Sequence, residues 1–434
     1  MLDGHYSEWL NLLVRWFHIT AGIAWIGASF YFNWLENNLV RKGKQKEGIT
    51  GYLWAIHGGG IYRLEKYKSA PDVMPETLHW FKWEAYVTWL TGMALLFIHY
   101  YMNATLYLID PQVMELASWQ AISIGLAVIV FTWVIYDFLC NQLQHKTQLL
   151  LLIGFVLMVL AAYGLSQVFS GRGAFIHIGA MIGTIMVANV SHVIMPSQRA
   201  LLAAVNKGEA VDPKYGAKAL LRSRHNNYLT LPVLFIMISN HYPSTFGAEF
   251  NWVILVALVV ISAAIRHYFN SRHQPEKNTW ILPIAAIALI TLAWVTKPAP
   301  YQAPVTSLKV SATMVEKTSE GKAEMPLSTM TEESEETVIA NTVEPLDSVA
   351  LQQQAMQIIQ ERCASCHAAK PTTNMFATAP NGIMFDTEQQ INIQAARIYQ
   401  RTVVLKTMPL VNITKITEEE RAIIGQWYHS LPPK

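Results

Sequence analysis

Apolar residues in this chain gather in long runs separated by short polar loops. An α-helix needs about 20 such residues to cross the hydrocarbon core of a bilayer. Runs of this kind predict about eight membrane spans, near residues 10–32, 80–102, 117–139, 147–169, 173–195, 226–242, 250–269 and 278–296. The sixth run is the weakest. The pattern predicts an all-α fold, with a polytopic membrane helix bundle over residues 1–297.

The pattern changes after residue 297. Residues 298–345 are rich in Pro, Ser, Thr and Glu, a composition that cannot bury enough apolar surface to fold, which predicts a flexible linker. Within residues 346–434, segments 348–361 and 417–431 have the pattern of helices. Thr417 and Glu420 have the spacing of a capping box at the start of the second helix. A small helical domain is therefore expected at the C-terminus.

Composition and charge agree with a membrane protein. Apolar residues make up 52% of the chain and charged residues only 14%, and the net charge of +2 does not suggest a nucleic-acid partner. Lys and Arg are dense in loops 40–68 and 199–224, whereas loops 103–116 and 243–249 contain none. The positive-inside rule then puts the 33–79 and 197–224 loops in the cytoplasm and both termini in the periplasm. The start of the chain lacks a basic region, so no cleaved signal peptide is expected.

One short motif carries clear chemistry. Cys363, Cys366 and His367 form a C-x-x-C-H sequence, in which two thiols bind the vinyl groups of a haem and the histidine binds its iron. A redox or zinc pair is the alternative, but the chain has no second cysteine pair. Met408 is the expected second axial ligand, because a proline follows it in a loop. Methionines 375 and 384 are competitors. The expected cofactor is one covalent haem c, and the expected chemistry is electron transfer.

Histidines also occur within the predicted spans. His18, His99 and His177 are expected at one depth in the outer half of the bilayer, where they could hold a b-type haem. The alternative is that each is hydrogen-bonded within the bundle. Lys82, Glu84 and His192 are expected in the inner half. Lys82 and Glu84 could also simply extend to the interface.

Four stretches and the haem motif indicate a family. Residues 16–27, 57–63, 74–86 and 189–196 resemble the bacterial membrane-bound urate oxidases, which join an eight-span domain to a periplasmic cytochrome c. The C-terminal segment resembles class I cytochrome c. The first two spans more weakly resemble membrane-type haem-binding protoporphyrinogen oxidases, whose histidine and lysine match His18 and Lys82.

The urate oxidase resemblance implies oxidation of urate to 5-hydroxyisourate. Water would supply the oxygen, and electrons would pass through haem c to a downstream cytochrome c or a terminal oxidase. A transporter with a redox tail and a quinol-oxidising protein are the alternatives.

A pocket for urate should offer a cation, a base and flat apolar walls. Glu84 or His192 could act as the base, and Lys82 and Arg63 could offset the charge. His57 and Asn189 could hydrogen-bond the ring amides, while Trp80, Trp83 and Tyr86 could stack on the ring. Since urate is made in the cytoplasm, access from the inner side is expected. Each residue has a plainer alternative, such as interfacial anchoring for the tryptophans.

Overall fold

The computed structural model describes most of the chain on both sides of the predicted linker. The described residues are 4–43, 46–68, 70–71, 73–111, 113–272, 278–296, 348–373, 375–376, 379–380 and 383–432. The predicted linker, residues 298–345, lies outside them.

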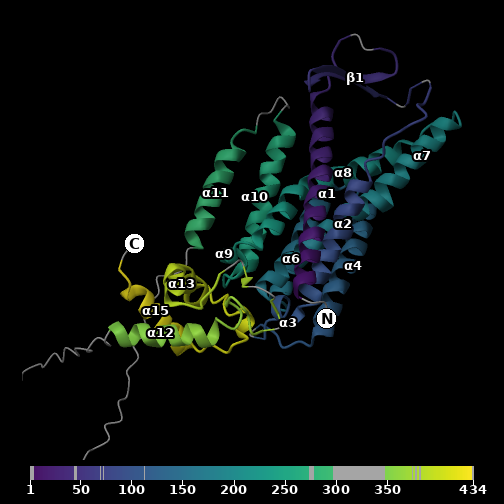
Figure 1. Cartoon of the computed structure of the whole chain (residues 1–434). Helices are drawn as coiled ribbons and strands as arrows, with labels where there is room; N and C mark the ends of the chain where they lie inside the picture. Colours follow the sequence, from purple (N-terminus) through teal and green to yellow (C-terminus); the bar gives the residue numbers. More distant parts are fainter. Residues whose placement is uncertain are drawn as a thin grey trace, which may run out of the picture.

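Long helices form the first part of the chain (Figure 1). A helix satisfies its own backbone hydrogen bonds, as apolar segments in lipid require. The long helices are α1 (Gly4–Asn38), α2 (Trp83–Leu96), α4 (Ser118–Gln142), α5 (Thr147–Ser166), α6 (Gly171–Ala188), α8 (Pro213–Ser239), α10 (Asn251–Ser271) and α11 (Ile281–Val295). Shorter helices are α3 (Ala104–Tyr107), α7 (Met195–Asn206) and α9 (Pro243–Phe246). Each predicted span overlaps one of the long helices.

Several helices have the dimensions of membrane spans. By length and apolarity, five helices of the described part qualify: Trp9–Asn38, Ser118–Gln142, Thr147–Ser166, Gly171–Asn206 and Asn251–Ser271. Helix α11 is apolar but shorter. This composition is consistent with membrane association, although fewer helices qualify than the sequence predicts.

Two of the predicted spans differ in shape from the expectation. The run 80–102 becomes α2 followed by a π-helical turn, η1 (Phe97–Tyr101). The run 226–242 lies inside α8, which begins well before it and has Pro232 in its interior. The first half of α8 carries Arg222 and His225, so its apolar part is short.

A β-hairpin interrupts the helical pattern between α1 and α2. Strands β1 (Ile49–His57) and β2 (Gly60–Tyr67) pair antiparallel, with His57 opposite Gly60. Gly58 and Gly59 have φ angles of 57° and 79°, and a tight two-residue turn of this kind needs positive φ at both positions. The all-α prediction omits this hairpin, because the Lys and Arg content of residues 40–68 indicates a loop.

The two ends of the bundle carry different parts of the chain. The hairpin and the far end of α7 lie at one end, whereas the start of α1 lies at the other (Figure 1). Helices α6 and α7 are joined through a π-helical turn, η2 (Asn189–Ile194), into one long helix. The main apolar core lies between α2, α4, α5, α6, α8 and α10.

The C-terminal part forms a separate group of helices. They are α12 (Ser348–Arg362), α13 (Glu388–Ile393), α14 (Ala395–Ile398), η4 (Tyr399–Val404), η5 (Leu410–Asn412) and α15 (Glu418–Ser430). Ile359, Ile424 and Trp427 are fully buried in its own core. The predicted capping box is present, since Thr417 Oγ1 accepts from the Glu420 N–H at 3.2 Å and Glu420 Oε2 accepts from the Thr417 N–H at 2.8 Å. Element η5 contacts α3, so this group lies at the end of the bundle opposite the hairpin.

Candidate functional site

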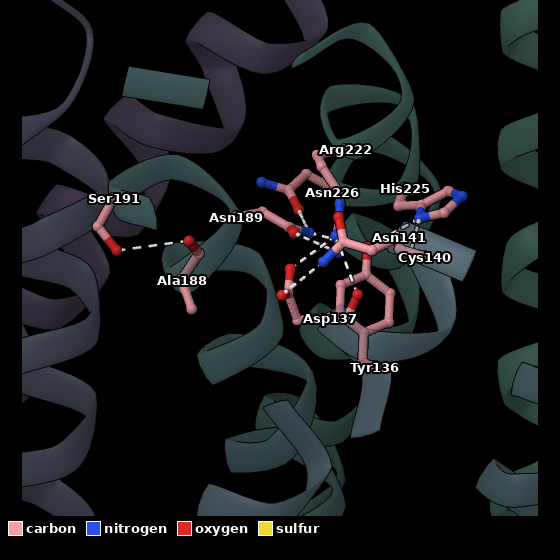
Figure 2. A network of polar contacts seen from close by, with 10 residues as sticks. All are labelled: Tyr136, Asp137, Cys140, Asn141, Ala188, Asn189, Ser191, Arg222, His225 and Asn226. Carbon is pink, nitrogen blue, oxygen red and sulfur yellow. Dashed lines mark hydrogen bonds and ion pairs between the residues drawn. The ribbon is translucent and has the colours of Figure 1, made fainter. Parts of the chain in front are cut away.

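A buried network of polar side chains joins α4, η2 and α8 (Figure 2). Asn189 is fully buried, and its Nδ2 donates to Tyr136 Oη at 3.0 Å and to Asn226 Oδ1 at 2.9 Å. Asn226 in turn donates to the carbonyl of Met186 at 2.8 Å. Because buried polar groups are costly unless hydrogen-bonded, this network fixes how the three helices meet.

An ion pair between a buried arginine and a part-exposed aspartate lies at the centre of the network. Arg222 is only 1% exposed, and its Nη2 donates to Asp137 Oδ1 at 2.6 Å. Its guanidinium lies 4.9 Å from the centre of the Tyr136 ring, and its Nη1 reaches Asn189 Oδ1 at 3.4 Å. The carboxylate offsets the charge that burial makes unfavourable.

The network extends to a histidine. Tyr136 Oη lies 2.8 Å from His225 Nδ1, and Cys140 Sγ lies 3.9 Å from the same nitrogen. A phenol and an imidazole can each donate and accept a hydrogen bond. The pair of Tyr136 on α4 and His225 on α8 can therefore pass a proton between these helices, whereas the Asn189 amide only donates a hydrogen bond to Tyr136.

The predicted substrate residues of the hairpin lie away from this network. His57 is exposed at the turn. Arg63 lies 4.8 Å from the ring centre of Tyr52 and forms an ion pair with Glu65 at 2.8 Å. Arg63 is thus already engaged by its own hairpin.

A second group of predicted residues surrounds the start of α2. Glu84 Oε1 lies 3.8 Å from His79 Nε2, while Glu84 Oε2 is buried without a hydrogen-bond partner among the described residues. Lys82 Nζ lies 5.6 Å from the Trp83 ring centre. Two further aromatic residues pack against a small apolar cluster at the α2–η2 contact; they are Trp80 and Tyr86.

The third group lies on η2. Asn189 belongs to the buried network, whereas His192 is exposed, with Nδ1 2.7 Å from Ser191 Oγ and its ring 5.8 Å from that of Trp133. Glu84 therefore faces His79 and His192 faces Trp133, so the two candidate bases have different neighbours. The predicted substrate set is spread over three places.

The three candidate haem b histidines differ in their hydrogen bonds. His18 Nδ1 lies 2.9 Å from the Thr88 carbonyl, and its Nε2 has no hydrogen-bond partner in the described part of the chain. His177 is fully buried, with Nδ1 2.8 Å from the Gly173 carbonyl and Nε2 3.1 Å from Tyr101 Oη. Both nitrogens of His177 are engaged, so it has the bonds of a structural histidine.

His99 lies nearer than His18 to the end of the bundle where α1 begins. Its Nδ1 is 3.4 Å from Asn11 Nδ2, and its ring stacks on Tyr107 at 4.3 Å. Asn11 precedes His18 by two helical turns, or about 10 Å along the axis. His18 is thus deeper than the common level expected from the sequence.

In the C-terminal domain, the haem motif follows α12. His367 Nδ1 lies 2.9 Å from the Ile383 carbonyl, which leaves Nε2 for a metal. Burial raises the pKa of the Cys363 thiol to about 12, and the neighbouring Cys366 adds to this effect. A thiol held neutral in this way is a poor redox nucleophile. The Met408 backbone is held at both ends, its N–H by Arg401 and its carbonyl by Arg421, each at 3.0 Å.

Sequence reasoning missed the centre of the buried network. Arg222 has the pattern of a cytoplasmic loop cation, and Asp137 and Tyr136 lie at the end of an apolar run. The one available signal was an ionisable residue, Asp137, inside a predicted span.

These features define a helical protein with apolar, membrane-type helices and a separate helical C-terminal domain. The family model described as "Urate oxidase N-terminal" matches residues 4–297, and the chain belongs to this family. No curated protein matches the chain, and neither does any solved structure.

Proposed function

We propose that this protein oxidises urate to 5-hydroxyisourate in its helical bundle and passes the electrons to a haem c in its C-terminal domain. The family match over residues 4–297 is the observation that carries the proposal, since the family indicates urate oxidation. In the reaction, urate and water give 5-hydroxyisourate, two protons and two electrons. The oxygen comes from water, so the chain must remove protons and conduct electrons.

The C-terminal domain has side chains that fit a haem. Cys363 and Cys366 are free thiols next to His367, whose Nε2 is left available for iron. Trp427 is fully buried, yet its Nε1 has no partner among the described residues, which suits an acceptor group that a cofactor would bring. When bound, haem c accepts electrons singly.

Met408 is the proposed second iron ligand. Met384 lies between Ile383, whose carbonyl is 2.9 Å from His367 Nδ1, and Phe385, whose N–H donates to the His367 backbone carbonyl at 2.7 Å. The two neighbours of Met384 therefore contact His367 at Nδ1 and at its backbone, and not at Nε2, which would bind the iron. Among the described residues, the Met408 backbone bonds Arg401 and Arg421 and makes no hydrogen bond to His367.

A b-type haem in the bundle is a further part of the proposal. His18 supports it, because an imidazole whose Nδ1 bonds a carbonyl presents Nε2 to iron. His99 is the proposed partner on the other helix. A pyridine haemochrome spectrum of the purified protein separates b from c haem. A strict ratio of one haem to one chain would exclude the b haem.

Glu84 is the proposed base that removes a proton from urate or water. Its buried Oε2 lacks a partner among the described residues, so it can accept a proton without first losing a hydrogen bond. The hydrogen-bonded pair of Tyr136 and His225 is the proposed group that then carries protons away from the bundle.

The proposed location is the bacterial inner membrane, with both termini in the periplasm. Residues 33–79 and 197–224 would face the cytoplasm, because their Lys and Arg content is high. The structure's two ends support this arrangement, since the hairpin and the C-terminal domain lie at opposite ends. Reporter fusions that place residues 207–212 in the periplasm would overturn it.

The deciding experiment is urate turnover by the purified full-length protein. Anaerobic urate should reduce haem c, and isotopically labelled water should appear in 5-hydroxyisourate. Glu84→Gln should lower kcat strongly, by about 100-fold or more, while haem content stays normal. His192→Ala tests the other candidate base. Normal kcat in both variants would remove both residues from proton transfer, and absence of urate turnover by wild type would reject the function.

A further inference from the structure

A cavity of about 340 Å³ lies between α1, α8 and α10. It lies near the C-terminal ends of α1 and α10, at the end of the bundle that carries the hairpin. Its volume is in the range of small-molecule sites. Its lining combines cations, amides and aromatic rings, a set that none of the three groups of predicted substrate residues brings together.

Arg266 is the buried cation of this cavity. It is only 6% exposed, its Nε donates to Asn227 Oδ1 at 3.0 Å, and its guanidinium lies 3.8 Å from the Phe30 ring centre. Among the described residues no carboxylate forms an ion pair with Arg266, in contrast to Arg222. A buried charge without a counter-ion is unfavourable, so an anion in the cavity would stabilise it.

The amides around the cavity present acceptors. Asn33 donates its Nδ2 to the Ser29 carbonyl at 2.8 Å, and Asn37 donates to the Asn270 carbonyl at 3.1 Å. Asn270 donates to Asn227 Oδ1 at 2.7 Å. Their own Oδ1 atoms accept no hydrogen bond from the described residues, so they can accept from N–H groups of a ligand.

We propose that this cavity is the site where the urate monoanion first binds. The identity of the ligand rests on the proposed function. The charge of urate would pair with Arg266, its ring N–H groups would donate to the amide oxygens, and Trp34 and Phe269 provide flat apolar surface. A lipid phosphate would share the charge, but it lacks the planar ring and the several N–H donors.

The cavity binds substrate rather than performing the chemistry. Its lining contains no carboxylate and no histidine among the described residues, so it offers no base. The ring centres of Phe32 on α1 and Phe81, in the segment before α2, lie 4.9 Å apart, and neither residue lines the cavity. Substitutions at Arg266 should therefore act on KM and on binding, whereas Glu84→Gln should act on kcat.

The test is binding of radiolabelled urate to the full-length protein in vesicles of neutral phosphatidylcholine. Arg266→Met should raise Kd by about 10- to 100-fold, because a charge-assisted hydrogen bond is lost. Asn33→Asp should weaken binding similarly, since its carboxylate would add a negative charge to the lining that contains Arg266. Arg199→Met, at an exposed position on α7, is the matched control and should leave Kd unchanged.

A second readout separates binding from structural damage. Without urate, Arg266→Met should unfold at the same or a higher temperature, because it removes an unpaired buried charge. The stabilisation by urate seen in wild type should be lost. Unchanged Kd in both Arg266→Met and Asn33→Asp would overturn the site while leaving urate oxidation intact. Loss of urate binding in vesicles with anionic lipid would identify a lipid headgroup as the occupant instead. A wild type that neither binds nor oxidises urate would reject both proposals.

Discussion

At the scale of residues, the buried cations of the bundle differ in whether a carboxylate accompanies them. Arg222 has Asp137 at 2.6 Å, whereas Arg266 bonds Asn227, lies over the Phe30 ring and has no carboxylate partner among the described residues. A completed ion pair with further hydrogen bonds suits a structural role. A buried cation that lines a cavity and has no carboxylate partner among the described residues suits the binding of an anion.

The sequence predicts part of this chemistry. Asn189 is predicted to hydrogen-bond the ring amides of urate, and in the structure its Nδ2 donates to Tyr136 and Asn226. Arg222 is missed because its partner Asp137 is 85 residues away in the sequence. Local hydropathy cannot show that two rim residues on different helices will meet.

We expect Asp137→Asn to destabilise the bundle by about 3 kcal/mol or more, because it leaves Arg222 buried without a counter-ion. Thermal unfolding in detergent, followed by circular dichroism, measures this loss. The double variant Asp137→Asn with Arg222→Met should recover part of the stability. Asp212→Asn is the control, since its pair with Lys214 is exposed and should contribute almost nothing. Equal effects of Asp137→Asn and Asp212→Asn would contradict the assigned role.

At the scale of elements, the regular helices follow from apolar runs, but their irregular turns do not. The π-helical turns η1 and η2 carry His99, Asn189 and His192. Such turns often occur at functional sites, and they form when contacts with other helices outweigh the regular hydrogen-bond pattern. The hairpin is similarly hidden, because its Trp54, Ile56 and Ile61 remain exposed and give no buried face.

The carboxylate of Glu420 on α15 accepts hydrogen bonds from Arg362 on α12, and the stability that it contributes can be tested by changing the pH. Burial alone would raise the pKa of Glu420, but hydrogen bonds from Arg362 and the Thr417 N–H hold it below its ordinary value. A lowered folded-state pKa means that this stability is complete above the unfolded pKa of about 4.3 and is lost as pH falls through the folded value. The protection factors of amide exchange in α12 and α15 should therefore fall below about pH 4.

Glu420→Gln should remove that pH step and weaken the pair at neutral pH by about 1 kcal/mol. Hydrogen exchange on the full-length protein measures both effects. Glu361→Gln is the matched control, because among the described residues the Glu361 side chain accepts a hydrogen bond only from Gln357 on the same helix. A pH step that persists in Glu420→Gln would show that another group is responsible.

At the scale of the whole molecule, the charge pattern and the structure agree on which segments share an end. The hairpin and the α7–α8 junction lie together, and the start of α1 lies with the C-terminal domain (Figure 1). The Lys and Arg content of the loops predicts this arrangement, because the positive-inside rule assigns each loop to one end of the bundle. The contact of η5 with α3 could not be predicted, since it depends on how a separate domain is oriented.

Tyr107 is the last residue of α3, the helix that contacts η5 of the C-terminal domain. Tyr107 stacks on His99 at 4.3 Å, with 23° between the ring planes. Burial raises the pKa of Tyr107, and Arg172, 5.5 Å from the ring centre, opposes this effect. The stacked rings of His99 and Tyr107 would therefore offer electrons a path from the bundle toward the C-terminal domain.

We expect Tyr107→Ala to slow the reduction of haem c by urate, because it removes the ring that stacks on His99 from α3, the helix that contacts η5 of the C-terminal domain. Stopped-flow absorbance of the haem after mixing with urate measures this rate, and equilibrium binding of urate should stay unchanged. Tyr107→Phe keeps the ring and should reduce haem c at nearly the wild-type rate. A slow Tyr107→Phe would assign the effect to the hydroxyl group, and an unchanged rate in Tyr107→Ala would show that electrons reach the haem by another route.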